Sequence, residues 1–195
     1  MAVADCTGHG VPGAFMSMLG ISLLNETVTK SSFDSPAEIL ERLRRKIKKL
    51  LHQNFNDDSA KDGMDMSVGI IDYENLEFQF AGAYNPGFIV SSDSQLVKLE
   101  ADLQPVSIHL VENEFTNKHY KLAVNDCIYL FTDGYVDQIG GYLNKKFMMK
   151  NFKKLLVDFY PYPMEEQKRL LRQKFIEWKA DYSQIDDILV LGIRV

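Results

Sequence analysis

The chain begins with Met1-Ala2-Val3-Ala4-Asp5-Cys6-Thr7-Gly8-His9-Gly10-Val11-Pro12-Gly13. These letters predict a short apolar strand that ends at an acid, then a glycine turn and a helix with proline in its first turn. A carboxylate at a strand end, next to backbone that glycine leaves free to bend, suits a hard cation. The same sequence is also compatible with an ordinary turn aspartate that hydrogen-bonds its own backbone. The hypothesis of a metal site therefore depends on other acidic residues.

Two more acidic stretches lie far along the sequence, Thr132-Asp133-Gly134 and Gln184-Ile185-Asp186-Asp187. Asp133 follows an apolar strand predicted at 127–131, where an ionised carboxylate is costly unless it is paired or bound to metal. Asp186 and Asp187 are predicted to open the last strand, so that one of them can face a shared site.

We expect Asp5, Asp133 and Asp186 to converge on one pocket lined with oxygen atoms. Because no cluster of histidines or cysteines accompanies them, the donor set favours Mg²⁺ or Mn²⁺ over zinc. His9 lies inside the glycine turn beside Asp5, where it would orient water or phosphate or bond the turn itself.

Apolar periodicity predicts the order of the helices and strands. Helices are expected at 11–30, 35–51, 144–160 and 164–180, and strands at 66–70, 76–80, 87–90, 95–99, 127–131 and 188–195. Consecutive strands joined by short turns pair antiparallel. The expected fold class is therefore α+β, a sandwich of antiparallel sheets flanked by helices.

The first helix is expected to carry two kinds of rows. One is a broad apolar stripe of Phe15, Met18, Leu19, Ile21, Leu24 and Val28, and the other is a row of small residues, Gly13, Ala14, Ser17 and Gly20. The small row would allow close approach to a sheet. The second helix carries a dense basic run of Arg42, Arg44, Arg45, Lys46, Lys48 and Lys49. An exposed helix face is favoured for this run over a docking surface for an acidic partner.

Length and composition narrow the function class. The 195 residues, 46% of them hydrophobic, predict one domain over 1–195, and the net charge of −5 argues against a nucleic-acid binder. Cys6 and Cys127 lie in apolar surroundings and are expected to be buried, reduced thiols of a cytoplasmic protein. No signal peptide and no apolar run of about 18 residues is seen, so no membrane segment is expected in this chain.

Two other motifs suggest sites that compete with the metal site. Gly8 to Gly13 matches G-x-G-x-x-G, but Asp5 would repel a pyrophosphate and the next element is a helix rather than a parallel strand. Asp58, Asp62 and Gly63 faintly resemble a calcium loop, within a stretch at 56–65 that is better explained as a polar turn. A nucleotide-binding oxidoreductase and a calcium protein are therefore disfavoured.

Four stretches together resemble the ordered motifs of the SpoIIE/RsbU-type serine phosphatases, part of the metal-dependent protein phosphatase (PPM, protein phosphatase 2C-like) superfamily. They are Asp5 to Ala14, Ala81 to Pro86, Phe131 to Gly134 and Gln184 to Ile188. The resemblance covers nearly the whole chain. It implies an αββα sandwich, a two-metal site with Mn²⁺ or Mg²⁺, and hydrolysis of phosphoserine or phosphothreonine by a metal-activated water.

The resemblance also implies roles for single residues. Asp5 would contact both metals, the carbonyl of Cys6 would be a backbone ligand, and Asp133 and Asp186 would hold the second metal. Residues expected near the site without ligating are His9, Asn85, Gly134 and Asp187. The implied substrate is a phosphorylated anti-anti-sigma (STAS) regulator of bacterial signalling, and the implied context is a longer chain with an upstream sensor domain.

One departure from the family pattern concerns the start of the chain. Family members carry another metal-binding aspartate on a hairpin before the glycine turn, and only four residues precede Asp5 here. The sequence therefore predicts an N-terminally incomplete domain with an incomplete first-metal site and an open sheet edge through which a homodimer could form. The alternative function is a catalytically impaired domain that acts as a binding or scaffold module.

Overall fold

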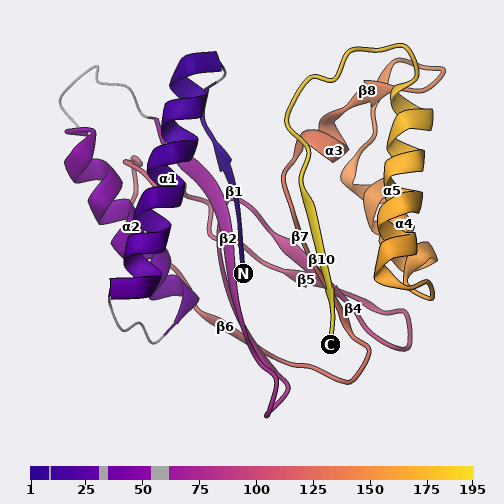
Figure 1. The fold of residues 1–195 in the computed structure, drawn as a ribbon, viewed down its shortest axis with the longest axis horizontal. Coiled ribbons are helices and arrows are strands. Elements are labelled where there is room, and N and C mark those ends of the chain that lie inside the picture. Colours follow the sequence, from indigo (N-terminus) through magenta and orange to yellow (C-terminus); the bar gives the residue numbers. More distant parts are fainter. Residues whose placement is uncertain (9, 31–34, 54–61) are drawn as a thin grey trace. The chain divides into compact units, whose positions relative to one another are not determined.

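The chain folds as two compact units that alternate along the sequence. The first unit comprises Met1–Pro86 and Glu100–Lys121, and the second comprises Gly87–Leu99 and Leu122–Val195. The computed structural model describes residues 1–8, 10–30, 35–53 and 62–195. Each unit combines one antiparallel sheet with helices (Figure 1).

The first unit is a four-stranded sheet covered on one face by two helices. The strands β1 (Ala2–Cys6), β2 (Met64–Asp72), β3 (Glu77–Ala83) and β6 (Lys118–Lys121) lie in the order β1-β2-β3-β6, and all neighbours are antiparallel. The helices α1 (Gly10–Lys30) and α2 (Pro36–Leu50) pack on this sheet. Ser35 caps α2 by accepting a hydrogen bond from the backbone of Glu38, as the capping pattern predicts.

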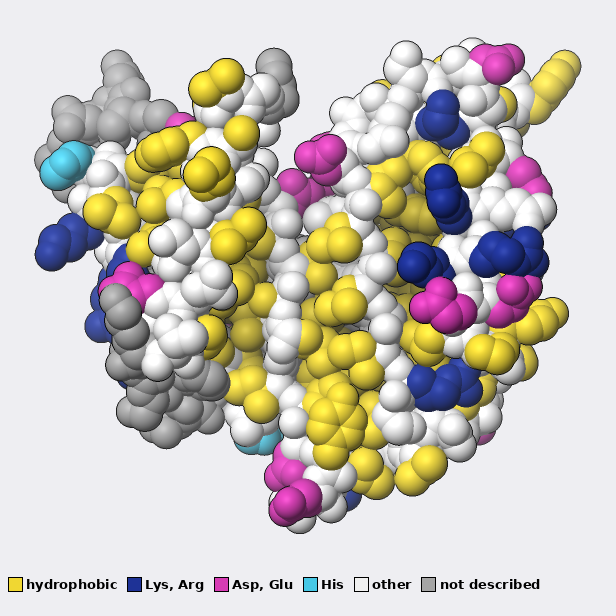
Figure 2. Space-filling model, viewed as in Figure 1, with side chains coloured by type: hydrophobic (Ala, Val, Ile, Leu, Met, Phe, Trp, Pro, Cys, Tyr) yellow, Lys and Arg dark blue, Asp and Glu magenta, His cyan; other side chains and the backbone are white. Residues whose placement is uncertain are grey.

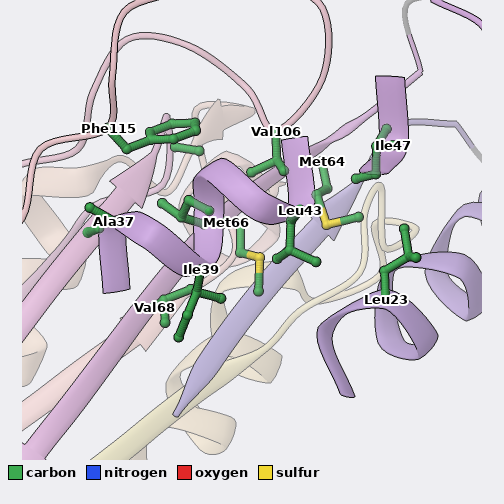
Figure 3. Packing of buried hydrophobic residues seen from close by; sticks show 13 residues of the cluster. Leu23, Ala37, Ile39, Leu43, Ile47, Met64, Met66, Val68, Val106 and Phe115 are labelled. Atoms are coloured by element: carbon green, nitrogen blue, oxygen red, sulfur yellow. The ribbon is translucent and has the colours of Figure 1, made fainter. Parts of the chain in front are cut away.

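The core of the first unit follows from alternation along β2. Met64, Met66 and Val68 point to one face, where Leu40 and Leu43 of α2 meet them. Figure 3 shows Leu43, Met64, Met66 and Val68 in one cluster with Leu23 of α1 and with Val106 and Phe115 of the long connection before β6. The full buried set is Leu23, Ala37, Ile39, Leu40, Leu43, Ile47, Met64, Met66, Val68, Ala81, Ala83, Val106 and Phe115.

The second unit has its own sheet and core. Its strands β10 (Val190–Arg194), β7 (Cys127–Phe131), β4 (Gly87–Val90) and β5 (Leu96–Leu99) lie in that order and are antiparallel. The helices α4 (Met149–Phe159) and α5 (Met164–Lys179) carry Phe152, Leu156, Leu171 and Phe175 into the core. Every residue of β7 is buried, as its continuous apolar run predicts.

Shorter elements complete the second unit. They are the helical turn α3 (Gly134–Asp137) and the small hairpin of β8 (Ile139–Gly140) and β9 (Lys145–Lys146). Trp178 of α5 holds this hairpin. Its ring nitrogen donates to the carbonyl of Gln138 at 3.0 Å, and its ring packs on Phe147.

The fold class is as predicted, α+β with antiparallel sheets flanked by helices, while several boundaries were wrong. The helix expected at 144–160 begins at Met149, because Lys145 and Lys146 pair with Ile139 and Gly140 instead. The last strand begins at Val190, so Asp186 and Asp187 lie in the loop before it rather than opening it. Asp65, assigned to the polar turn, lies inside β2.

Helix α1 turns the glycines of the predicted small-residue row toward the core, together with Met16, Leu23 and Thr27. Gly13 and Gly20 are both buried, and a side chain at Gly20 would meet the end of Met64 at 2.6 Å. Most of the predicted apolar stripe faces away from the core, with Phe15, Met18, Ile21 and Val28 exposed. Figure 2 shows hydrophobic side chains on the surface where Figure 1 places α1.

The basic run on α2 is not a uniform exposed face. Arg44 is buried, donates to Gln104 at 3.1 Å and to the carbonyl of Asn113 at 2.9 Å, and pairs with Glu41. Lys48 pairs with Glu112 at 2.6 Å. These bonds fasten the connection that precedes β6 to α2, so the exposed-face interpretation was wrong for Arg44.

No described helix is both long and apolar enough to cross a membrane.

Candidate metal centre

The first acidic position lies at the end of β1, directly opposite another acid. In the register of β1 and β2, Asp5 pairs with Asp65, Val3 with Ser67 and Cys6 with Met64. Residues directly opposite on antiparallel strands point to the same face. Because Met64 and Met66 face the helices, Asp5 and Asp65 lie on the other face of the sheet. We call these two residues the β1–β2 acidic pair.

The backbone on either side of this pair is clamped. The amide of Thr7 donates to the carbonyl of Gly63 at 3.0 Å, and the amide of Gly63 donates to the Thr7 hydroxyl at 2.9 Å. Beyond Thr7 the chain turns at Gly8, whose φ of +92° is in the left-handed region. A side chain at Gly13 would meet the carbonyl oxygen of Gly8 at 2.5 Å, so the turn packs tightly against the start of α1.

The remaining site residues predicted in the first unit are Cys6, Asn85 and His9. The Cys6 side chain packs against the core, and burial raises the pKa of its thiol, which keeps the thiol neutral and leaves only the backbone carbonyl as a candidate ligand. Asn85 follows β3 at the same end of the sheet, is buried, and has an amide nitrogen without a hydrogen-bond partner. His9, with Asp58 and Ala60 of the disfavoured calcium loop, lies outside the described residues.

In the second unit, Asp133 and Asp186 are brought to one place by Thr132. The Thr132 hydroxyl donates to the carbonyl of Asp187 at 3.1 Å and accepts from the amide of Leu189 at 3.0 Å. The Thr132 amide also donates to the carbonyl of Leu189 at 3.0 Å. Residues 186–189 are therefore fastened to the end of β7, although they are not part of β10.

Gly134 makes this arrangement possible. A β-carbon at this position would lie 2.2 Å from the carbonyl oxygen of Asp187 and 3.3 Å from the β-carbon of Asp186. The loop that carries Asp186 thus passes directly over Gly134, next to Asp133. We call Asp133, Gly134, Asp186 and Asp187 the β7-end loop site.

The carboxylates of the β7-end loop site are accessible. Asp133, Asp186 and Asp187 are all exposed. Asp186 accepts from the amide of Asp187 at 2.7 Å, which leaves its second oxygen for another contact. Nearby, a hydrogen bond to Asp137 raises the pKa of Lys146, and the charge of Asp133 adds to this effect.

These donors fit a hard divalent cation. In the described part of the chain, no three or more His, Cys, Asp or Glu side chains form a ready-made cluster. Each unit nevertheless presents two acids at one place, the β1–β2 acidic pair and Asp133 with Asp186, and all their donor atoms are oxygen. Oxygen donors with room for water suit Mg²⁺ or Mn²⁺. The prediction that Asp5, Asp133 and Asp186 meet in one pocket stays a prediction.

The sequence pattern does not identify Asp65 as a candidate site residue. Acidic and small residues precede it, and they favour a polar turn. The alternation of Met64, Met66 and Val68, which continues through Ile70, was the signal that would have placed it in the strand.

A dinucleotide site at the glycine turn is excluded by the topology. Among the described residues, α1 is followed by helix α2, and β1 pairs only with the antiparallel strand β2. Within the described ranges, β1 therefore lacks the parallel neighbour that a dinucleotide-binding unit requires.

Comparisons with known proteins agree with this architecture. The family model described as Stage II sporulation protein E (SpoIIE) matches residues 1–195. A comparison with curated protein sequences finds no match. Among solved structures, the SiaA-PP2C domain of Pseudomonas aeruginosa is 27% identical with a TM-score of 0.88, over 100% of this chain and 74% of that one.

Two more distant structures share the fold. The PP2C phosphatase domain with a regulatory fragment of SpoIIE from Bacillus subtilis is 21% identical with a TM-score of 0.75, and the match covers 99% of this chain and 53% of that one. The catalytic domain of the serine/threonine phosphatase PstP, in complex with two manganese ions, is 15% identical with a TM-score of 0.65, over 98% and 85%. The chain thus spans about half the length of the SpoIIE structure.

The family match extends over every stretch from which the two acidic sites are built. The similar structures are PP2C-type phosphatase domains, and the fold resemblance covers the whole chain. The chain belongs to the SpoIIE family.

Proposed function

We propose that this chain is a Mg²⁺- or Mn²⁺-dependent serine/threonine phosphoprotein phosphatase domain of bacterial signalling. The observation that carries the proposal is the family match over residues 1–195, which includes both acidic sites. The proposed substrate is a cytoplasmic regulator phosphorylated on serine or threonine, of the anti-anti-sigma (STAS) type.

In this proposal Asp5, Asp133 and Asp186 hold the cations, with the Cys6 carbonyl as a further donor. Bound cations would neutralise the phosphate and lower the pKa of a water that attacks phosphorus in line, displacing the serine or threonine oxygen. The manganese ions of the PstP structure, which has the same fold, support the choice of metal.

The chain's own residues would position these groups. Thr132 fixes the backbone of Asp187, and Gly134 lets the loop pass close enough to set Asp186 beside Asp133. The unpartnered amide nitrogen of Asn85 is a donor suited to a phosphate oxygen. Asp187 acts through its backbone carbonyl, which anchors the loop on Thr132.

The test is hydrolysis of p-nitrophenyl phosphate and of a phosphoserine STAS protein, each with Mn²⁺ and with EDTA. Since loss of an outer-sphere partner of a metal costs about 10–100-fold, Asp133→Asn should lower kcat/KM by at least ~100-fold. Asp137→Asn is the matched control, because this partly exposed acid four residues on is paired with Lys146 at 2.7 Å and should matter little.

Two results would overturn the proposal. One is hydrolysis that persists in EDTA or in Asp133→Asn. The other is a chain that binds phosphorylated STAS protein but does not hydrolyse it with either metal, which is the behaviour of the alternative binding module.

A further inference from the structure

We infer that Asp65 is a further carboxylate ligand for the cation that Asp5 holds. The inference rests on the proposed function, because it needs the divalent cation. It adds to the site a residue from β2, a strand that supplied none of the ligands expected from the sequence.

The argument begins with the register. Asp5 and Asp65 are directly opposed across β1 and β2, on the face that points away from the helices. Side chains in such positions have β-carbons about 4.5–5.5 Å apart, so their carboxylates can share one ion. A cation accepts monodentate or bidentate oxygens from both strands without a change in the backbone.

The position of the acids agrees with this role. Neither acid contributes to the apolar core of the first unit, which lies on the other face. A cation bound between the two strands would be attracted by both carboxylates.

A second observation comes from Ser67. It lies on the same face as the acidic pair, two residues along β2 from Asp65 and directly opposite Val3. Its side chain is fully buried, and its hydroxyl has no hydrogen-bond partner. A buried hydroxyl is costly without a partner, and a water in the coordination shell of a cation at the acidic pair would supply one.

The strand is also held rigidly enough to serve as a ligand platform. Thr7 and Gly63 clamp the strand ends on one side, and the amide of Val106 donates to the carbonyl of Met64 at 2.8 Å on the other. Both anchors, at Gly63 and Met64, directly precede Asp65 and fix the start of β2. A ligand on a fixed strand loses little freedom on binding.

The experiment is titration calorimetry of Mn²⁺ into the whole chain and into Asp65→Asn, with Asp5→Asn as the positive comparison. We expect Asp65→Asn to raise the dissociation constant for Mn²⁺ at least ~10-fold. Glu77→Gln is the matched control, because Glu77 is an exposed acid on the neighbouring strand β3, weakly paired with Lys121 at 3.7 Å. It should leave Mn²⁺ affinity unchanged.

Thermal unfolding gives a readout that a merely structural residue would not produce. The melting temperature of each chain in EDTA is the baseline for its own gain in Mn²⁺. In Mn²⁺, Asp65→Asn should gain less stability than the unsubstituted chain. Asp65→Ser serves as a second variant if the amide is poorly tolerated.

The outcomes separate this inference from the proposed function. If Asp5→Asn loses Mn²⁺ while Asp65→Asn binds it normally, or if Asp65→Asn only lowers the melting temperature in EDTA, Asp65 is not a ligand and the proposed function stands. If the unsubstituted chain binds no Mn²⁺, the metal dependence itself fails, and the inference fails with it.

Discussion

At the scale of single residues, Gly134 decides how the β7-end loop site is built. Gly134 follows the candidate ligand Asp133. A glycine is needed there because no space exists for a side chain, and not because of an unusual backbone conformation. The carbonyl of Asp187 occupies the place where a β-carbon would stand, 2.2 Å away. Backbone cannot rotate aside as the end of a side chain can, so a substitution must move the loop that carries Asp186.

Gly134→Ala should therefore destabilise the second unit and weaken Mn²⁺ binding together. Forcing a methyl group into a packed site costs about 1–3 kcal/mol. Urea unfolding without metal measures the first effect, and calorimetry measures the second.

Gly192→Ala is the matched control for this prediction. Its β-carbon would meet the terminal methyl of Met164 at 2.7 Å, which is the flexible end of a side chain. We expect Gly192→Ala to lower the free energy of unfolding by less than ~1 kcal/mol, since the flexible end of Met164 can repack around the added methyl group. Equal losses for the two alanines would contradict the steric role assigned to the Asp187 backbone.

Most of the candidate site, but not all of it, can be predicted from the sequence. Asp133 and Asp186 were identifiable because each follows or precedes an apolar strand at a glycine or polar turn. Asp65 was not, because its neighbours on the N-terminal side read as a turn and only tertiary pairing reveals that it faces Asp5. Opposition across strands is a property of register, which no local pattern of one strand contains.

At the scale of elements, α1 shows what periodicity cannot decide. The helix is apolar on more than one side, so its sequence permits more than one buried face. The face chosen is the one that carries Gly13 and Gly20, because small residues let the helix approach the Gly8 turn and Met64 closely. Close approach, rather than the larger side chains, selected the orientation.

Two alanine substitutions on α1 test this orientation. Leu23 is 6% exposed and Ile21 is 62% exposed, although both are large aliphatic residues of one helix. Leu23→Ala should cost about 2–5 kcal/mol in the free energy of unfolding, because it leaves a cavity in the core. Ile21→Ala should stay within ~0.5 kcal/mol, as is usual for surface positions.

Chemical denaturation of the two variants gives the comparison directly. A large loss at Ile21 and a small one at Leu23 would mean that the predicted apolar stripe, and not the glycine face, packs on the sheet.

One of the wrong boundaries has a clear tertiary cause. A helix was expected from residue 144, yet Lys145 and Lys146 form a two-residue strand in a hairpin whose Gly140 and Gly141 lie against Trp178. A tertiary contact therefore overrode local propensity. The capped helix α2 and the hairpin of β4 and β5, whose signals are local, appear where they were expected.

At the scale of the whole molecule, the two units are interleaved along the chain. The chain passes from one unit to the other after Pro86, after Leu99 and after Lys121. The segment Glu100–Lys121 returns to the first unit, where it supplies Val106 and Phe115 to the core and strand β6 to the edge of the sheet. A unit built from separated segments cannot be completed by its first segment alone.

A chain that ends at Pro86 should therefore lack a cooperative thermal transition. It loses the edge strand, two core side chains and the Gln104 and Asn113 partners of the buried Arg44. Of its described partners, Arg44 then keeps only the ion pair with Glu41. Losing the large core side chains Val106 and Phe115 costs several kcal/mol, about as much as the whole stability of a small domain.

The matched comparison joins residues 1–86 to residues 100–121 through a short Gly/Ser linker. The end of the first segment and the start of the second lie close together. The amide of Tyr84 donates to the carbonyl of Asp102 at 2.8 Å, and Ala83 forms a parallel β-bridge with Asp102. We expect this joined chain to melt cooperatively in circular dichroism, since every group of the first unit is present. If 1–86 alone melts at the same temperature as the joined chain, the returning segment is dispensable and the first unit is a continuous domain after all.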